Sequence, residues 1–581
     1  MEQRSVWQMR PVVTAAIGLV AAVAIQQLLD HTAPTGAWSQ PGPFRMALSI
    51  GVGVAAILAI FTIERVRWTW GVAFAISGGC VAGLVSWWSG PVSDTAEFRD
   101  WRTACLFLSI AIAAPLFQTA RDVGARRFDY VAVHGHVWTN IVLWGASCVF
   151  TGIAFALTYL LSELFSLIGI HVLRDLLRHG WANAALAGAA FGGAAGLFRE
   201  RDAVVRTLQR VVTAVLAVLA PVLGAGLLLF LIALPFTGLS ALWDATKSTT
   251  PILLACAIGA FILINAVLGD GEEEERGRPL HWGAMGLGLA VLPLAVIAAI
   301  ATGLRIGQYG FTPDRLWALT FVIVAAAYGV AYLVTLLRWR QGWAPHLRPA
   351  NLRLAFALCV LALLLATPIV SFNAISTRDQ VARLESGRTR PDRFDWRALA
   401  FDFGAPGRRA LERLKLAADP ATARLAREAA AKTNRWEVAD IAGAARARDT
   451  LDRRLRILPV RVTLPPELLA KLTDYDACGR GSDDRCTLLY RPGATETVVV
   501  KEGCLDRLTT NDRMAFAACD VSRLVLADGK WVTASDIAVP DRDAATRAAI
   551  GAGLRSGVIE VRPVTRRQVF IGGKPVGSPF E

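Results

Sequence analysis

The chain has 581 residues, of which 54% are hydrophobic and only 19% are charged, whereas about 25% of the residues in an ordinary soluble protein are charged. The formal net charge is +14, yet the sequence has no zinc-finger spacing, RNA-recognition signature or basic block interleaved with aromatic residues, so we do not expect nucleic-acid binding. The composition predicts a polytopic membrane protein whose main partner is the lipid bilayer.

Hydropathy predicts eleven transmembrane helices, each long enough to cross a hydrocarbon layer of ~30 Å. Their approximate limits are 11–29, 43–63, 69–88, 101–119, 138–159, 181–198, 209–234, 251–269, 282–303, 315–337 and 352–374. The first follows a short basic segment and is followed by further spans, so we interpret it as a membrane helix rather than a cleaved signal peptide. Residues 1–375 are therefore predicted to form an α-helical bundle.

The segment 130–173 contains one acidic or basic residue, Glu163, when histidines are counted as neutral. As a single helix it would be about 66 Å long, roughly twice the hydrocarbon thickness. We expect instead a span over 138–159, followed by a second helix that lies on the membrane surface and carries Glu163 on its polar face.

The distribution of basic residues predicts the orientation, because cytoplasmic connections are enriched in Arg and Lys. Connections on the N-terminal side hold fifteen basic residues: Arg4, Arg10, Arg65, Arg67, Arg121, Arg126, Arg127, Arg199, Arg201, Arg206, Arg276, Arg278, Arg338, Arg340 and Arg348. The opposite connections hold five: Arg99, Arg174, Arg178, Lys247 and Arg305. This bias predicts a cytoplasmic N-terminus, and the odd number of spans then places the C-terminal region outside the cytoplasm.

Two features inside the spans predict how helices pack or break. Gly188, Gly192 and Gly196 recur every four residues and predict close packing against another helix of the same bundle; Gly79 and Gly83 repeat the pattern once. Pro221 lies in a long uncharged stretch and predicts a broken helix, a feature of some transporter binding sites.

The composition changes after the last span. Residues 376–454 are charged and rich in Ala with helical spacing, for example in 409–415 and 421–431. Residues 455–581 predict a small β-rich or α+β domain, with strands at 457–464, 487–490, 497–501, 522–526 and 531–534 and a hairpin at 568–571 and 574–576.

Five segments in the middle of the chain resemble the bacterial membrane-protein family described as domain of unknown function 4153. They are Trp138-Thr-Asn140, Leu160-Leu-Ser-Glu-Leu-Phe-Ser-Leu-Ile-Gly-Ile170, Leu234-Pro-Phe-Thr-Gly-Leu-Ser-Ala-Leu-Trp243, Asn265-Ala-Val-Leu-Gly-Asp-Gly271 and Tyr309-Gly-Phe-Thr-Pro-Asp-Arg315. The resemblance covers roughly residues 130–337. It implies a multi-pass topology and a membrane location, but no established activity and no functional residues.

Polar residues near span ends are the candidates for a site, since polar groups in a membrane are costly. On the periplasmic side we expect a cluster of Glu163, Trp243, Tyr309, Asp314 and Arg315, and a pairing of Glu163 with Arg315 would make a site there more plausible. On the cytoplasmic side Asn140 and Asn265 form a candidate pair that could hydrogen-bond across the bundle, with structural packing as the alternative.

Histidines and cysteines predict no metal centre. His134 and His136 have no nearby Cys, third His or acid cluster, so we interpret them as an exposed pair. Cys478, Cys486, Cys504 and Cys519 lie close together in the tail, and an even number in an oxidising compartment predicts two disulfides. We favour the pairs Cys478–Cys486 and Cys504–Cys519, each closing a short loop.

Two functions remain open. One is a non-enzymatic envelope protein whose bundle displays a periplasmic sensing or partner-binding domain for another envelope protein or a glycan. The alternative is a transporter or flippase of a small or lipid-linked substrate, which many spans, Pro221 and Pro293 favour. We expect no enzyme, cofactor or metal, because no nucleophile motif, phosphate loop or metal-ligand set occurs. A polar cavity at bilayer depth would favour the transporter.

Overall fold

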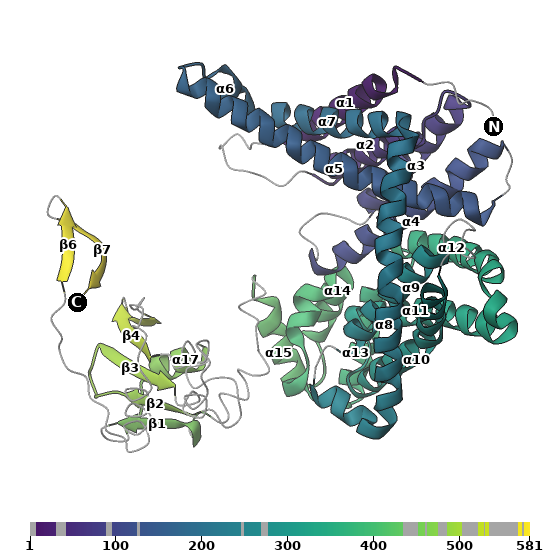
Figure 1. Cartoon of the computed structure of the whole chain (residues 1–581). Coiled ribbons are helices and arrows are strands. Elements are labelled where there is room, and N and C mark those ends of the chain that lie inside the picture. Colours follow the sequence, from purple (N-terminus) through teal and green to yellow (C-terminus); the bar gives the residue numbers. More distant parts are fainter. Residues whose placement is uncertain are drawn as a thin grey trace. The chain divides into compact units, whose positions relative to one another are not determined.

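The structure is a computed structural model that describes residues 7–30, 42–88, 96–124, 128–245, 249–268, 277–433, 451, 453–458, 462–474, 485–501, 521–527, 529–533, 567–571 and 574–580. In this part of the chain, eleven helices are long and apolar enough to cross a membrane. They are α1 Arg10–Leu29, α2 Pro43–Thr62, α3 Trp68–Trp88, α4 Ala96–Val123, α5 Tyr130–Leu167, α7 Gly180–Glu200, α8 Asp202–Ala245, α9 Thr249–Leu268, α10 Arg278–Tyr309, α11 Pro313–Trp339 and α12 Ala344–Ala366. All eleven predicted spans are confirmed (Figure 1).

Helix α5 differs from its prediction because it is one continuous helix of 38 residues, about 57 Å long, and does not break near residue 159. No Gly or Pro lies in its last four turns, so nothing in the local sequence ends the helix there. It stops just before Gly169, whose φ of +81° is a left-handed conformation that glycine adopts readily. The short helix α6, Val172–Leu177, follows.

Helix α8 also differs from its prediction, since it runs through Pro221 without a break. Its non-helical residue is Gly238, with φ 77° and ψ 157°. Gly283 of α10 packs so closely on Ala220 and Pro221 that a Cβ at Gly283 would overlap them. This contact supports the helix on both sides of the proline, and neighbouring helices allow proline inside a span in this way.

The predicted glycine seam packs α7 against α1 inside the bundle. A Cβ at Gly188 would overlap the carbonyl of Gly18, and a Cβ at Gly192 would overlap that of Thr14. The second pair of glycines, on α3, lies against α2, where Gly79 meets Gly51 and Ala55. Small residues thus let backbones approach closely, as in other membrane helix pairs. The antiparallel α1 and α7 therefore bring the start of α1 beside the end of α7.

Apolar side chains fill the space between α8, α9, α10 and α11. Fully buried members include Ile264 of α9, Leu287 and Leu294 of α10, and Ala220 of α8. A second apolar core joins α2, α3, α4 and α12, with Leu58, Ala82 and Ala366 buried in it. Close-packed apolar side chains make up most of both cores.

The contacts between residues divide the chain into two compact units: Met1–Val381 with Asp402–Gly407, and Ala382–Phe401 with Arg408–Glu581. Helix α13, Phe372–Glu385, crosses the boundary in sequence, and α14, Gly404–Leu414, and α15, Pro420–Ala430, follow it. The second unit has a core of its own. Trp396 is fully buried there, and its indole N–H donates to the carbonyl of Pro391 at 2.9 Å.

A five-stranded sheet forms the later part of the second unit, in the spatial order β1-β2-β3-β4-β5. Its strands are β1 Leu455–Leu458, β2 Cys486–Leu489, β3 Glu496–Lys501, β4 Val521–Ala527 and β5 Lys530–Thr533, and a separate hairpin joins β6 Arg567–Ile571 to β7 Lys574–Phe580. β1 and β2 are parallel, and the other neighbours are antiparallel. Helix α17, Pro466–Asp474, was not predicted; it buries Leu468 and Leu472 in the core of the sheet.

Candidate functional site

The structure gathers charged residues at the span ends that lie on the N-terminal side of the bundle. These residues, here called the charged cluster, come from the start of α1, the end of α2, the end of α4, the first part of α5 and the end of α7. Successive spans alternate in direction, so these ends share one side. The members are Arg10, Glu64, Arg121, Asp122, His136, Arg199 and Glu200.

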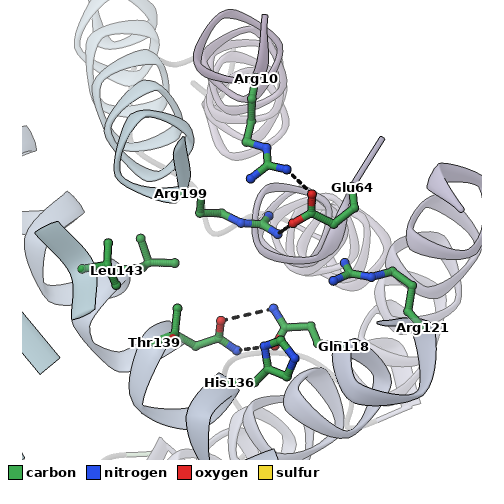
Figure 2. A pocket seen from close by; sticks show the side chains of 10 residues that line it. Arg10, Glu64, Gln118, Arg121, His136, Thr139, Leu143 and Arg199 are labelled. Carbon is green, nitrogen blue, oxygen red and sulfur yellow. Dashed lines mark hydrogen bonds and ion pairs between the residues drawn. The ribbon is translucent and has the colours of Figure 1, made fainter. Parts of the chain in front are cut away.

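Glu64 lies between two arginines at the centre of the cluster (Figure 2). One carboxylate oxygen accepts from Arg10, and the other lies 2.5 Å from Nη2 of Arg199. Both arginine side chains are only 9% exposed, and that of Glu64 is 21% exposed. Glu200 holds the outer side of Arg10, with Oε1 3.0 Å from Nε. A buried charge is tolerated only when it is paired in this way.

Side chains of the charged cluster, together with Gln118, donate hydrogen bonds to the last backbone carbonyl groups of α2. The last carbonyl groups of a helix have no partner inside the helix. Arg199 donates to the carbonyl of Ile60 at 2.8 Å, Gln118 donates to that of Phe61 at 2.8 Å, and Arg121 donates to that of Thr62. Cationic groups also stabilise the negative end of the helix dipole. Side chains from α4 and α7 thus cap α2.

Arg121 and Asp122 extend the cluster towards α5. Nη2 of Arg121 lies 2.6 Å from Oδ1 of Asp122, and Nε2 of His136 lies 3.2 Å from Oδ2 of the same carboxylate. Gln118 and Asn140 form a double amide hydrogen bond beside them, at 2.9 and 3.2 Å. Helix α5 is therefore attached to α4 by the contact between His136 and Asp122 and by an amide pair.

A small cavity of about 60 Å³ lies inside the charged cluster (Figure 2). Its walls carry three guanidinium groups and one carboxylate, together with amide, hydroxyl and imidazole groups. The lining residues are Arg10, Glu64, Gln118, Arg121, His136, Thr139, Asn140, Leu143, Arg199 and Val205. Leu143 and Val205 belong to an apolar core that also contains Ile60 and Phe61. An apolar layer beneath the cavity lowers the local dielectric and strengthens the interactions between these charges.

A second polar group, here called the asparagine cluster, lies around Asn265 near the end of α9. Its members are Tyr130, His134, Asn265, Tyr332 and Asn351, which come from α5, α9, α11 and α12. Oδ1 of Asn265 accepts from the hydroxyl of Tyr130 at 2.9 Å and from the amide of Asn351 at 3.1 Å. These contacts join four helices through neutral groups.

The structure therefore gives Asn140 and Asn265 different partners. Both bond across the bundle, as proposed from the sequence, but Asn140 pairs with Gln118 and Asn265 pairs with Tyr130 and Asn351.

The expected periplasmic cluster comes together only in part. The guanidinium of Arg315 lies over the ring of Tyr309, 5.3 Å from its centroid, and donates to the carbonyl of Gly310 at 2.7 Å. Asp314 is in the first turn of α11, where an acidic side chain suits the helix dipole. Glu163 is exposed near the end of α5, which projects away from the junction of α10 and α11 in Figure 1. The side chain of Trp243 lies outside the described residues.

The interpretation of His134 and His136 as an exposed pair is wrong. His134 is buried; its Nε2 accepts from the indole of Trp138 at 3.0 Å. His136 is directed to Asp122, so the two rings serve different clusters. Neighbours two apart on a helix point in different directions, and α5 is packed on both of these faces. No group of three or more metal-ligating His, Cys, Asp or Glu residues occurs in the described ranges.

Sequence reasoning missed the charged cluster. Arg10, Arg121 and Arg199 all lie at span ends, where they were counted as solvent-facing loop charges. A usable signal was present, because Asp122 and Glu200 lie next to Arg121 and Arg199 at two of these ends, and Glu64 lies at the end of α2 on the same side. Arginines that only fulfil the positive-inside bias need no such partners.

The cysteines divide between the two units. Cys80, Cys105, Cys148, Cys256 and Cys359 are free thiols in the membrane helices. Cys486 is fully buried at the start of β2. The other three cysteines of the tail lie outside the described residues, so both predicted disulfides stay predictions.

The fold and the charged cluster define a multi-pass membrane protein with a paired charge network at one end of its helices. The chain belongs to the family described as domain of unknown function 4153, whose family model matches residues 12–414. This match is wider than the resemblance over 130–337 indicated, and it includes the first spans. No curated protein and no solved structure matches the chain.

Proposed function

We propose that this protein is a non-enzymatic protein of the bacterial inner membrane, whose bundle anchors a partner-binding C-terminal unit on the periplasmic side. The observation that carries this proposal is the apolar packing between α8, α9, α10 and α11, where buried Leu, Ile and Ala side chains occupy the space that a transport path would need. The second unit has its own sheet and its own core. A tightly packed anchor and a separately folded unit suit display better than transport.

The periplasmic placement is supported by the excess of arginines on the N-terminal side. Three of the fifteen counted there, Arg10, Arg121 and Arg199, are buried in the charged cluster and have a structural reason to be present. Twelve against five remain when these three are set aside, so the sign of the bias is unchanged.

Reporter fusions after Glu385 test this placement, since that residue ends α13. We expect activity from a reporter that works only in the periplasm. Activity from a reporter that works only in the cytoplasm would contradict both the orientation and the display function.

The cysteines give a second test of the compartment. Cys504 follows β3 by three residues and Cys519 precedes β4 by two, while β3 and β4 pair with Val500 opposite Val521. This register favours a disulfide between Cys504 and Cys519 across the connection from β3 to β4. Cys478 and Cys486 would then form the second disulfide. Short-loop disulfides of this kind contribute on the order of 3 kcal/mol each. Peptide mapping without reductant should find both bonds; four alkylatable thiols would contradict them, and crossed peptides would contradict only the pairing.

The partner surface that we propose is the outer edge of β5, and the partner is an extended segment of another envelope protein. β5 is the last strand in the spatial order of the described sheet, and Val532 on it is 44% exposed. An edge strand presents backbone groups that can pair with an incoming strand.

A photo-cross-linking residue at position 532 in living cells tests this surface. We expect one discrete protein adduct. The same residue at Leu416, which is 88% exposed in the helical part of the second unit, is the matched control and should give none. Equal adducts from both positions, or none from position 532, would contradict strand addition.

The second candidate, a transporter or flippase of a small or lipid-linked substrate, is favoured by the cavity in the charged cluster. Transport would require this cavity to open to both sides of the membrane in turn. Thr139→Cys places a thiol in its wall. Labelling of that thiol from both sides, in intact cells and inverted vesicles, would favour transport over display. Labelling from the N-terminal side alone would favour display, with the unsubstituted chain as the control.

A further inference from the structure

We propose that the cavity in the charged cluster binds one oxyanion of the phosphate class, either inorganic phosphate or the phosphate of a lipid headgroup. This inference concerns the membrane bundle and does not depend on the function of the C-terminal unit. It is carried by the hydrogen-bonding capacity of the walls, by the size of the cavity and by its place at the span ends.

The acceptor atoms on the walls are already engaged. Oε1 and Oε2 of Glu64 are held by Arg199 and Arg10, respectively. Oε1 of Gln118 accepts from Asn140, and Oδ1 of Asn140 accepts from Gln118. A cation in the cavity would have to share these oxygens with the donors that already hold them, and it would lie beside three guanidinium groups. The walls therefore suit a cation less well than an anion.

Donor groups, in contrast, exceed the contacts that use them. Each guanidinium carries five N–H bonds in a planar fork that matches the geometry of phosphate. Arg10, Arg121 and Arg199 line the cavity together and are each at least nine-tenths buried. The lining itself holds three guanidinium groups and the single carboxylate of Glu64, while Asp122 and Glu200 pair with Arg121 and Arg10 from outside the lining. An acceptor with negative charge is the ligand that complements this surface.

The size and place of the cavity agree with a small oxyanion. One buried water needs roughly 10–15 Å³ of such space. The cavity has about 60 Å³, which is enough for several waters or for one tetrahedral anion. It lies among the start of α1 and the ends of α2, α4 and α7, and span ends are where a bilayer places its lipid phosphates. Both sources of phosphate are therefore candidates.

The test uses the full chain, purified in a maltoside detergent and freed of lipid and phosphate, with thermal unfolding as the readout. One arm adds inorganic phosphate, and the other adds a short-chain phosphatidylglycerol, with a short-chain diacylglycerol as the phosphate-free control. We expect at least one arm to raise the unfolding temperature in a saturable way, and the responding arm identifies the source. No saturable rise in either arm, or an equal rise with diacylglycerol, means that only water fills the cavity and overturns the proposal.

Two variants assign the response to the cavity. Arg121→Gln removes one guanidinium, and we expect the apparent affinity to fall by about tenfold or more. Asn140→Asp adds a carboxylate that can keep the bond from Gln118 and pair with the arginines. We expect it to raise the unfolding temperature without ligand and to abolish the response, and it remains informative if Arg121→Gln does not fold. Arg338→Gln, at an exposed position on the same side, should respond like the unsubstituted chain. A response that survives in Asn140→Asp overturns the assignment.

Discussion

The charged cluster and the asparagine cluster lie on the same side of the bundle, and α5 contributes to both, yet they use different chemistry. The charged cluster joins Arg, Glu and Asp side chains from α1, α2, α4 and α7, with His136 of α5 at its edge, around a cavity. The asparagine cluster joins amide and phenol groups from α5, α9, α11 and α12 by direct hydrogen bonds.

The difference determines how each cluster responds to the loss of one member. A buried ion that loses its partner keeps the full cost of desolvation, so the charged cluster should fail sharply. A neutral hydrogen bond between membrane helices contributes typically less than about 1 kcal/mol, so the asparagine cluster should weaken gradually.

The largest effect is expected from Glu64→Gln, because it removes the carboxylate shared by Arg10 and Arg199. We expect a loss of about 3–5 kcal/mol in the free energy of unfolding, the usual cost of breaking a buried ion pair from one side. Denaturant unfolding of the purified chain in detergent measures it. Glu163→Gln, at an exposed position near the other end of α5, is the matched control and should change little. If Glu64→Gln lowers the free energy of unfolding by less than Asn265→Leu does, the charged cluster is not the more sensitive of the two.

The next largest effect is expected from Gly192→Ala, which acts on the seam that assembles the charged cluster. The added methyl would overlap the carbonyl of Thr14, so α1 must shift away from α7 and carry Arg10 with it. Such overpacking costs about 1–3 kcal/mol. Gly145→Ala in α5, where no heavy atom lies within 4 Å of the new methyl, is the control and should be neutral or slightly stabilising. Equal unfolding curves for the two variants would show that the close contact is not required.

A smaller effect is expected from Asn265→Leu. The substitution removes hydrogen bonds to Tyr130 and Asn351 but introduces no charge, so we expect a loss of about 1–2 kcal/mol. The same denaturant measurement checks it. A sharp loss of folded protein would mean that the neutral cluster is as sensitive as the charged one.

The smallest effect is expected from His136→Gln. His136 is at the edge of the charged cluster, and Asp122 keeps its bonds to Arg121 when the imidazole is removed. A partly exposed pair is worth at most about 0.5 to 1 kcal/mol. A loss as large as that of Glu64→Gln would place His136 at the centre of the network instead.

The sequence predicted the membrane helices well because hydropathy reports directly on transfer into a bilayer. All eleven spans were identified, and the strands of the tail lie near their predicted places. Length arguments were less successful: α5 continues past residue 159 because its own residues favour helix, although its length exceeds the bilayer. Helix α17 was missed although Pro466 begins it and Glu467 follows, which is a typical start for a helix.

The charged cluster could not be derived from hydropathy. An arginine at a span end has the same hydropathy value whether its side chain faces water or a carboxylate on another helix. Which of the two holds depends on which helices are neighbours. The glycine seam on α7 predicted a close neighbour but not that the neighbour is α1. The packing of Gly192 on Thr14 holds the end of α7 beside the start of α1, where Arg10 and Arg199 share the carboxylate of Glu64.

The capping of α2 by side chains from later helices has a consequence for synthesis of the protein. Glu64 precedes Arg199 by 135 residues, so α2 is made when Arg10 is the one of its two arginine partners already present. The carbonyl groups at the end of α2 likewise lack these side-chain donors until Gln118, Arg121 and Arg199 have been synthesised. A chain that stops before the end of α7 therefore lacks Arg199, one of the two arginines that pair with Glu64. Completion of α7 is thus the step at which the first half of the bundle closes.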